Sequence, residues 1–476
     1  MNFINQKLEE FERYIRNRKV AIIGLGVSNI PLLDYFTEKG SIVTVFDNRK
    51  VEEIDENVLK KIQEKGINYS FGENSLVNLV GFDLIFRSPS CRPDTPELYA
   101  EAVRGAIITT EIEMLIELCP GIVIGVTGSN GKTITASLIY EIVKEKGYEC
   151  YLGGNMGIPL FTKVGEMSPN CVCVLELSSF QLMDIKISPQ IAVITNISPN
   201  HLDIHKSYEE YIDCKKNIFR FQEKDGLVVL NYDNEITKPM VSEVNGKLIY
   251  FSRKTKLDDG VIYDNGIIKN CVDGIRRHIL TIDDAISLKG MHNYENICAA
   301  IAATSALVEP EIQARAITKF TGVEHRLEYV RTINGVKWYN DSIGNNPTRT
   351  IAGLNAFDEP IVLIAGGDDK DLDYDVIAKP ILKNVSGLVL MGVTADKIQE
   401  AVEKQLELNR NDPMKCKLVT ELPIYRCNSL EEAVSKAHEI ATEKEIVLFS
   451  PASASFDMFK NFMERGQKFK ELVNEL

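Results

Sequence analysis

The stretch GVTGSNGKTITASLIYEIV, residues 125–143, joins an apolar, strand-like run to a helix through a glycine-rich loop. Its Gly-Lys-Thr is typical of loops whose backbone N–H groups hold phosphate, with the helix N-terminus favouring the anion. The usual spacing GxxxxGK[ST] requires glycine at 126, where this chain has Val126 and places its glycines at 125, 128 and 131. The stretch therefore predicts a parallel α/β domain with a variant phosphate loop.

This loop predicts binding of ATP with Mg²⁺. Lys132 is expected to contact the terminal phosphates, and the Thr133 hydroxyl is expected to contact the ion. The alternative is a glycine-rich turn from strand to helix that binds no ligand. The loop residues expected around the nucleotide are Gly128, Ser129, Asn130 and Gly131.

Composition narrows the class of protein. The chain has 476 residues, enough for about three domains. Hydrophobic residues at 44% and a formal charge of -14 indicate a soluble protein without a nucleic-acid groove or an anionic membrane surface. Residues 1–19 lack the apolar core of a signal peptide and no segment approaches about 18 uninterrupted apolar residues, so neither a signal peptide nor a membrane span is expected. Its ten cysteines form no CxxC pair, which favours reduced thiols in a cytoplasmic protein.

Short β-branched runs alternate with helical patterns along the whole chain, which predicts doubly wound parallel sheets. A Rossmann-like unit opens with KVAIIGLGVSN, residues 19–29, and a second unit begins near Glu111. A third follows TGVEHRLEY, which starts at Thr321. We predict three domains, over residues 1–111, 112–322 and 323–476.

Polar residues follow two further strands of the second unit. Because the carboxyl ends of parallel strands meet at one edge, they are expected to lie beside the phosphate loop. Glu176 and His201 are candidate Mg²⁺ ligands, although Glu176 could instead be a charge at a helix N-terminus. His205 is expected to face solvent. The polar positions are Glu176, Asn196, Asn200, His201, Asp203 and His205.

The next helix contains a lysine in an unusual place. Ser207 and Glu210 form a capping-box pattern that predicts the start of the helix. At helical spacing Lys215 falls within an apolar stripe, while Lys216 turns toward solvent. The Lys215 side chain is expected to snorkel to water. Burial would instead lower the pKa of its amine and leave chemical modification open.

Loops of the first and third units are further candidates. In GLGVSN, Asn29 departs from the dinucleotide fingerprint, so the turn is either structural or holds a nucleotide diphosphate with Asp47 near the sugar or base. In the third unit, three polar loops each follow a strand. Asp341 is a candidate contact for metal or nucleotide, Lys370 for an acidic substrate and Ser455 for a carboxylate.

Seven motifs together resemble the Mur ligases across nearly the whole chain. They are TGSNGKT (127–133), GGNMGIPL (153–160), LELSSFQL (175–182), NISPNHLDIH (196–205), GMHNYENICAA (290–300), EHRLEYV (324–330) and SPASASFDMFKNFMERG (450–466). The third and the last resemble the members that join D-glutamate to UDP-N-acetylmuramoyl-L-alanine. The resemblance implies a Rossmann-like N-terminal domain for the UDP moiety, a central ATPase domain and a Rossmann-like C-terminal domain for the amino acid.

The resemblance also implies ATP-dependent amide formation through an acyl phosphate, in cytoplasmic synthesis of peptidoglycan precursors by a monomer. Two Mg²⁺ ions are implied, and the catalytic groups are Lys132, Glu176, His201 and Lys215, the last as a carbamate. The metal would be held by Thr133, Glu176, His201 and Lys215, and ATP also by Asn293, Asn296, Arg326 and Asp341. The UDP substrate would be bound by Val27, Ser28, Asp47, Asn48, Arg49 and Asn155. D-glutamate would be bound by Lys370, Ser455 and the backbone of Phe462.

One loop departs from the family pattern. Many Mur ligases have DSKATN where this chain has DSIGNN, so a lysine is replaced by Ile343 and a threonine by Asn345. Arg349, six residues beyond Ile343, is a candidate source of replacement charge.

Alternative functions follow from single motifs. Within the superfamily they are other Mur-type ligases and folylpolyglutamate synthetase. A P-loop kinase would require the usual glycine spacing, and a nicotinamide oxidoreductase would require a complete dinucleotide fingerprint. A non-catalytic nucleotide-binding module would leave the polar loops of the three units unexplained.

Overall fold

The computed structural model describes residues 3–156, 159–200, 204–272, 274–282, 288, 290–369, 372–410 and 421–476, with the backbone alone at Val272. The chain divides into two compact units, Met1–Phe320 and Thr321–Leu476. Within the described residues the strands form three sheets, two in the first unit and one in the second. The mixed α/β fold with mainly parallel sheets is confirmed, while domain limits at 111/112 and 322/323 stay predictions.

The first sheet lies within residues 19–109, all of which are described, and its strand order is β3-β2-β1-β4-β5. Its pairings are parallel, as expected of a Rossmann-like unit. Residues 20–23 of β1 are buried, as the continuous apolar run predicts. The strands are β1 (Lys19–Ile23), β2 (Ile42–Asp47), β3 (Asn68–Phe71), β4 (Leu84–Arg87) and β5 (Ile107–Thr109). The helices are α1 (Gln6–Ile15), α2 (Ile30–Glu38), α3 (Glu56–Glu64) and α4 (Pro96–Arg104).

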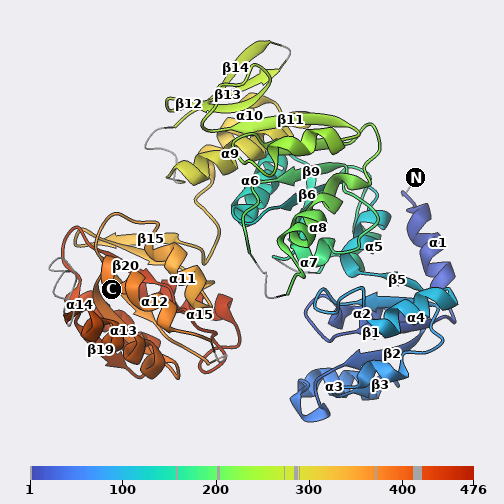
Figure 1. Ribbon diagram of the computed structural model, residues 1–476, viewed down its shortest axis with the longest axis horizontal. Coiled ribbons are helices and arrows are strands. Elements are labelled where there is room, and N and C mark those ends of the chain that lie inside the picture. Colours follow the sequence, from blue (N-terminus) through green and yellow to red (C-terminus); the bar gives the residue numbers. More distant parts are fainter. Residues whose placement is uncertain are drawn as a thin grey trace. The chain divides into compact units, whose positions relative to one another are not determined.

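In the second sheet, β6 lies between β9 and β8, and the order over the described residues is β14-β13-β12-β11-β10-β9-β6-β8-β7. Figure 1 labels β6 and β9 next to each other in this sheet. The strands from β7 to β12 pair in parallel, so the ends of β6, β8 and β9 share one edge. These strands are β6 (Ile122–Thr127), β7 (Glu149–Gly154), β8 (Cys171–Glu176), β9 (Ile191–Ile194), β10 (Leu227–Asn231), β11 (Lys247–Ser252), β12 (Gly260–Asp264), β13 (Ile267–Val272) and β14 (Ile275–Thr281).

Antiparallel strands β12, β13 and β14 extend this sheet, and the sequence analysis did not predict them. The β12–β13 turn consists of Asn265 and Gly266, whose φ angles are 49° and 81°. Asn-Gly favours such two-residue hairpins because both residues tolerate positive φ. This dipeptide was therefore the missed signal.

Helices α6 and α9 pack against each other in the second sheet's domain. Both are buried on several sides, which explains their many apolar and small residues. The helices of this region are α5 (Glu111–Leu118), α6 (Lys132–Lys146), α7 (Ser179–Leu182), α8 (Tyr208–Arg220), α9 (Met291–Thr304) and α10 (Pro310–Lys319). Among the described helices of the whole chain, none combines the length and apolarity required to cross a membrane.

The sheet of the second unit has the order β15-β16-β20-β17-β18-β19 in its described part. β15 is antiparallel to β16, and the other pairings are parallel. Alternate residues of β17 enter apolar clusters on opposite faces of the sheet. The strands are β15 (Glu328–Ile333), β16 (Val336–Asn340), β17 (Ile361–Ala365), β18 (Val385–Met391), β19 (Ile424–Cys427) and β20 (Ile446–Phe449). The helices are α11 (Pro347–Leu354), α12 (Asp375–Asn384), α13 (Ala395–Arg410), α14 (Leu430–Ile440) and α15 (Phe462–Glu475).

Candidate active site

The phosphate loop connects β6 to α6, and close packing fixes each of its glycines. Gly128 has φ 151°, and a Cβ there would lie 1.9 Å from Thr195 Oγ1. Gly131 has φ 80°, and a Cβ would lie 2.2 Å from Asn296 Oδ1. At Gly125 a Cβ would lie 2.7 Å from Pro189 Cγ. The variant spacing thus reflects close packing of the loop and of strand β6.

Side chains that follow β9 hold the loop in shape. Asn130 N donates to Asn196 Oδ1 at 3.0 Å, and Thr195 Oγ1 donates to Asn130 O at 2.6 Å. Ser129 Oγ lies 2.9 Å from the Tyr211 hydroxyl on α8. The Lys132 ammonium donates to the carbonyls of Gly128 and Ser129, at 3.0 and 3.1 Å. These hydrogen bonds fix the shape of the loop, whose backbone N–H groups and helix N-terminus suit a phosphate.

Lys215 on α8 lies against the same loop. Only 1% of the residue is exposed, so the expectation that it snorkels to water is wrong. Its Nζ donates to Gly128 O at 3.0 Å and to Thr127 Oγ1 at 3.3 Å, and it lies 4.7 Å from the centre of the Tyr211 ring. Burial, and then the charge of Lys132, lower the pKa of Lys215 well below its ordinary value. Two amines therefore share the Gly128 carbonyl.

Glu176 is the last residue of β8 and is 3% exposed. Its Oε1 accepts from Asn155 Nδ2 at 3.0 Å, whereas Oε2 is buried and has no hydrogen-bond partner among the described residues. Helix α7 begins after Ser178, whose own side chain caps it, so Glu176 does not cap that helix. An unpaired buried carboxylate oxygen fits a hard cation such as Mg²⁺.

The predicted metal ligand His201 lies outside the described residues, as does Asp203, another of the polar positions. Within the described segments no three His, Cys, Asp or Glu side chains gather as a metal site. Thr133 is buried in the first turn of α6, as expected for a hydroxyl at the phosphate loop. Of the predicted metal ligands, Thr133, Glu176 and Lys215 are described.

The expectation for His205 is wrong, because its side chain is buried. Its Nε2 lies 2.9 Å from Ser179 Oγ, and its ring stacks on Phe180 with 5.1 Å between centroids. The capping-box pattern before α8 is half confirmed. Ser207 Oγ accepts from Glu210 N at 3.2 Å, but the Glu210 carboxylate accepts from Lys206 N rather than from Ser207.

Helix α9 contributes Asn293 and Asn296, which were expected near the adenine. Asn296 is buried against Gly131, and its Nδ2 lies 3.4 Å from Asn293 Oδ1. Both asparagines are therefore at the phosphate-loop end of α9.

In the N-terminal sheet, Asp47 closes the GLGVSN turn. It accepts from Leu25 N at 2.8 Å and from two nitrogens of Arg49, at 2.8 and 2.9 Å. Burial raises the pKa of Asp47, but these donors outweigh burial and lower it overall. Asn29 Nδ2 donates to the carbonyls of Ile23 and Gly24, which explains why asparagine replaces a small residue. Val27 and Asn48 are exposed and Ser28 is half-buried.

Asp341 follows β16 in the second unit and is buried. Its Oδ2 accepts from Ser450 Oγ at 2.7 Å, and its Oδ1 accepts from Leu327 N at 3.2 Å. Burial raises the pKa of Asp341 to about 6, although Ser450 and the charges of Arg326 and Arg349 oppose the rise. His325 and Leu327, on either side of Arg326, have φ angles of 62° and 44°, so the turn that carries Arg326 is strained.

Arg465 on α15 was missed as a site residue, although it lies within a motif that the sequence analysis quoted. It is fully buried and donates to the carbonyls of Ser342, Ser453 and Ala454, at 2.9, 3.1 and 2.7 Å. Ser342 Oγ in turn donates to Phe462 O at 2.8 Å. The guanidinium thus joins the loop at Ser342 to the loop that carries Ser455, while Lys370 lies outside the described residues.

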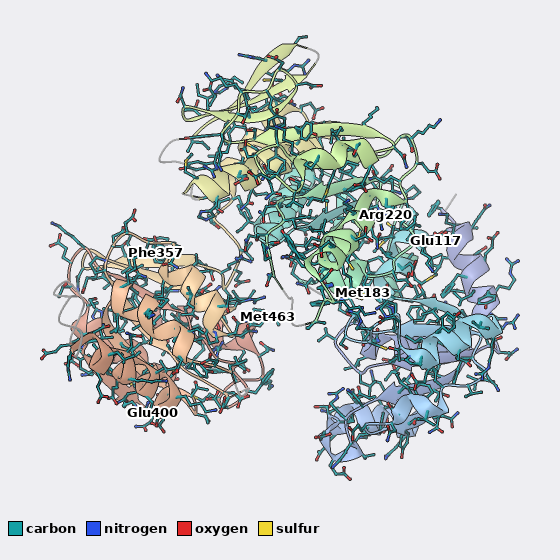
Figure 2. All side chains as sticks on the ribbon, viewed as in Figure 1. Glu117, Met183, Arg220, Phe357, Glu400 and Met463 are labelled. Atoms are coloured by element: carbon teal, nitrogen blue, oxygen red, sulfur yellow. The ribbon has the colours of Figure 1, made fainter. Side chains whose placement is uncertain are left out.

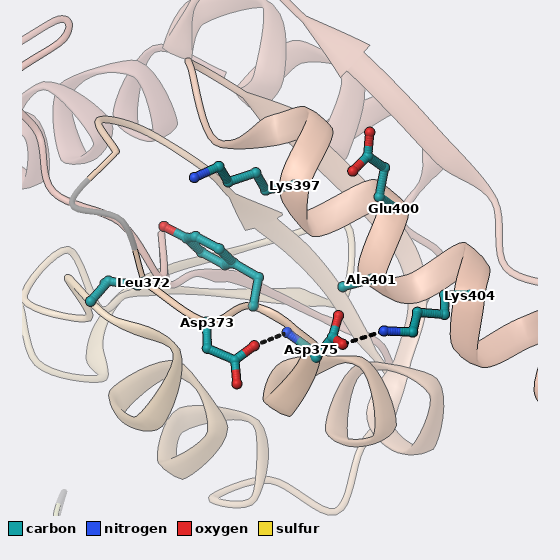
Figure 3. Close-up of a pocket in the computed structure, with 8 residues that line it drawn as sticks. Leu372, Asp373, Asp375, Lys397, Glu400, Ala401 and Lys404 are labelled. Atoms are coloured by element: carbon teal, nitrogen blue, oxygen red, sulfur yellow. Dashed lines mark hydrogen bonds and ion pairs between the residues drawn. The ribbon is translucent and has the colours of Figure 1, made fainter.

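A pocket of about 380 Å³ lies between α12 and α13. Figure 3 shows that its lining is mostly charged, and Lys404 pairs with Asp375 there. Lys397 pairs with Asp369 at 2.6 Å. None of the described candidate site residues lines this pocket, and its lysines are neutralised by carboxylates.

We expect Asp341→Asn to remove a pH dependence of stability. The pKa of the folded carboxyl is about 6, against about 3.9 when unfolded. Between these values the folded state binds more protons, so the contribution is present below about pH 4 and lost as pH rises through about 6. Relative to the unchanged protein, the variant should therefore gain about 2 kcal/mol from pH 4 to 7.5. Denaturant unfolding at several pH values measures this gain, and the exposed Asp358→Asn is the control. Parallel curves for Asp341→Asn and the unchanged protein would contradict the prediction.

Three domain families match the chain in order. They are the Mur ligase MurD-like N-terminal domain over residues 18–110, the Mur ligase middle domain over 126–304 and the Mur ligase glutamate ligase domain over 325–453. A UDP-N-acetylmuramoylalanine–D-glutamate ligase from Acetivibrio thermocellus is 47% identical over 474 residues, which is 99% of this chain and 100% of that protein. The chain belongs to the Mur ligase family. The resemblance found in the sequence is thereby confirmed.

Other Mur ligases agree with this assignment. The protein of the same name from Ruminiclostridium cellulolyticum is 47% identical over 99% of this chain and all of its own length. Among solved structures, the Mur ligase MurC from Thermotoga maritima matches with TM-score 0.56 and 19% identity over 96% of this chain and 99% of that one. MurF from Thermotoga maritima in complex with ADP matches with TM-score 0.51 and 17% identity, over 98% and 97%. These structures support the Mur ligase fold.

Proposed function

We propose that this chain joins D-glutamate to UDP-N-acetylmuramoyl-L-alanine at the expense of ATP, in the cytoplasmic synthesis of peptidoglycan precursors. Full-length identity of 46–47% to proteins named for this reaction supports the substrates. The observation that carries the chemistry is the phosphate loop in which Lys132 and Lys215 both donate to the carbonyl oxygen of Gly128. We propose that the chain acts as a monomer.

The reaction consists of two transfers. The carboxylate of the UDP substrate attacks the γ-phosphorus of ATP, ADP leaves, and an acyl phosphate forms. The amine of D-glutamate then attacks the acyl carbon, loses a proton and expels phosphate, which leaves an amide. Lys132 lies where it can neutralise charge that develops on the transferred phosphoryl group.

Two Mg²⁺ ions would be held by Thr133, Glu176, His201 and a carbamate on Lys215. When bound, the ions polarise the phosphoryl oxygens as Lewis acids. The orphan Oε2 of Glu176 supports a cation at that carboxylate, and Asn155 orients it through Oε1.

The environment of Lys215 supports its carbamylation. Its lowered pKa leaves a larger share of neutral amine, which is the form that attacks CO₂. The amine nitrogen bonds to the carbon of CO₂ and releases one proton, which gives a carbamate anion. The carbamate is negative where the protonated amine of Lys215 is positive, so its repulsion from the Lys132 ammonium becomes attraction.

The remaining substrate contacts are assigned by the loops that carry them. The UDP moiety is assigned to the N-terminal turn, because its α2 N-terminus favours phosphate and the Asp47–Arg49 pair fixes its shape. The adenine is assigned to α9. Arg326 and Asp341 are assigned to the nucleotide. D-glutamate is assigned to the loops that Arg465 joins. The assigned residues are Val27, Ser28, Asp47, Asn48, Arg49 and Asn155 for the UDP substrate, Asn293 and Asn296 for adenine, and Lys370, Ser455 and Phe462 for D-glutamate.

A phosphate-release assay tests the function. Purified protein with ATP, Mg²⁺ and UDP-N-acetylmuramoyl-L-alanine should release phosphate only when D-glutamate is added. A panel of amino acids separates the other Mur ligases, and a folate substrate with L-glutamate separates folylpolyglutamate synthetase. If D-glutamate gives no release above the panel background, the assignment fails.

The departure at Ile343 allows a specific prediction for Arg349. Arg349 lies in the first turn of α11, and its Nη1 donates to Ile343 O at 3.2 Å, so its charge lies beside the altered loop. We expect Arg349→Ala to raise the KM for D-glutamate about tenfold, because it removes a charged hydrogen-bond donor. Arg331→Ala is the control, because Arg331 is a half-buried arginine of the same unit that donates to Asn474 O instead. Unchanged kinetics for both ATP and D-glutamate would exclude this assignment.

A further inference from the structure

The loop that follows β4, residues 88–95, lies against the N-terminal turn proposed for the UDP moiety. Ser88 N donates to Ile23 O at 2.9 Å. A Cβ on Gly24 would lie 2.7 Å from Ser88 Oγ, which in turn lies 2.9 Å from Ser90 Oγ. A phosphate bound at the turn would therefore be next to this loop.

Arg87, at the end of β4, holds the base of the loop. Its guanidinium is buried, and it donates to Cys91 O at 3.1 Å and to the carbonyl of Met183 at the end of α7. Met183 is labelled in Figure 2. The loop is thus attached to the domain that carries the phosphate loop.

Arg92 connects the tip of the loop to the same domain. Its Nη2 donates to Glu210 Oε1 at 2.7 Å, and its Nη1 donates to Ile204 O at 3.1 Å. Nε donates to Asp94 Oδ1 at 2.9 Å, and Asp94 also pairs with Lys206. We name these five residues the Arg92 bridge. The side chains of Arg92 and Glu210 are each only 26% exposed, so the contact is partly shielded from water.

The bridge ends on the elements that form the ATP centre. Glu210 is in the first turn of α8, five residues before Lys215, and its carboxylate also accepts from Lys206 N at 2.7 Å. Ile204 directly follows residues 201–203, which include the proposed metal ligand His201. Because α8 is a regular helix, a shift of its first turn moves Lys215 against Gly128.

We propose that Arg92 is a positioning residue that couples the UDP-substrate loop to the ATP centre through Glu210 and the backbone of Ile204. This rests on the proposed function. When the UDP substrate contacts residues 88–95, Arg92 transmits this contact to the start of α8, so each substrate favours binding of the other. Such coupling is reciprocal by thermodynamic necessity.

A binding cycle tests the coupling. The Kd of the non-hydrolysable analogue AMP-PNP with Mg²⁺ is measured by calorimetry on the full chain, with and without saturating UDP-N-acetylmuramoyl-L-alanine. We expect a ratio of about tenfold between the two Kd values in the unchanged protein. In Arg92→Ala the ratio should fall to within about twofold of one, because the charged hydrogen bonds from Arg92 to Glu210 and to the backbone of Ile204 are lost. Arg92→Lys, which keeps the charge without the fork, should give an intermediate ratio.

Two further variants sharpen the test. Glu210→Gln should lower the ratio, and combining it with Arg92→Ala should lower the ratio no further, since both remove one contact. Arg18→Ala is the matched control. Arg18 pairs with Asp83 at 3.0 Å, at the amino end of β1, whereas the loop at residues 88–95 follows the carboxyl end of β4. It should keep the full ratio, and all variants are compared by thermal unfolding.

An unchanged ratio in Arg92→Ala would overturn the proposal, as would a ratio near one in the unchanged protein. An equal fall in Arg18→Ala would also overturn it. If one of these three outcomes is found while the protein still releases phosphate only with D-glutamate, the positioning role of Arg92 fails and the proposed function stands. If the unchanged protein does not bind UDP-N-acetylmuramoyl-L-alanine, the proposed function fails and this inference fails with it.

Discussion

Lys132→Ala should lower the rate of D-glutamate-dependent phosphate release by about a thousandfold, the size of effect measured when one preorganised donor to a developing charge is removed. The ammonium already lies on the phosphate loop, bonded to two of its carbonyls. Its charge therefore lies within the phosphate loop, and Lys132→Ala removes that charge from the loop.

Folding should survive this change. Lys132 lies near the buried amine of Lys215, so removing its charge relieves repulsion rather than leaving an unpaired carboxylate. Initial rates at saturating substrates measure the effect, with thermal unfolding in parallel. Lys144→Ala is the control, since Lys144 is on the same helix and its side chain is exposed. A variant within about threefold of the unchanged rate would contradict the catalytic assignment of Lys132.

Lys215→Met should have opposite effects on activity and stability. Activity should fall at least a hundredfold, because neither an amine nor a carbamate remains near the phosphates. Stability should rise, with an unfolding midpoint about 2–4 °C higher, because an apolar side chain of similar size replaces a buried cation. Lys215 occupies an almost fully buried position, which methionine fills.

The pH dependence of the stability difference distinguishes the removal of a buried charge at Lys215 from a simple gain in packing. The pKa of Lys215 is lowered in the folded state, against about 10.4 when unfolded. Between these values the unfolded chain binds more protons, so the unchanged protein gains stability as pH rises. The advantage of Lys215→Met should therefore shrink from pH 7 to 10 in buffers freed of CO₂. Lys216→Met, which loses an ion pair with Glu243, is the neighbouring control. A constant advantage across this range would disprove the buried-cation account.

Local patterns predicted the features that depend on residues close in sequence. The phosphate loop, the start of α8 at Ser207 and the place of Lys215 on the apolar stripe of α8 all follow from short-range spacing. The order of strands after the loop also predicted that Glu176 and Asn196 lie near it, because parallel strands end at one edge.

The missed features depend on contacts between distant residues. His205 looks like a solvent-facing residue in a polar loop, but Ser179 and Phe180, some 25 positions earlier, cover it. Arg92 is a charged residue in a loop and Arg465 one in helix α15, and only the fold brings carbonyls and carboxylates to them. The side chain of Lys215 does not reach water for the same reason, because its ammonium group lies against the phosphate loop.

The packing around Gly125 and Val126 makes the glycine spacing of this phosphate loop hard to exchange for the usual spacing. Glycine at 126 alone would empty a fully buried site in β6, at a cost of about 2–4 kcal/mol. A side chain at 125 alone would collide with Pro189 and crowd Ile218. A lineage that moved between the two loop types one substitution at a time would thus pass through a poorly folded ancestor, which makes the glycine spacing a durable marker of descent.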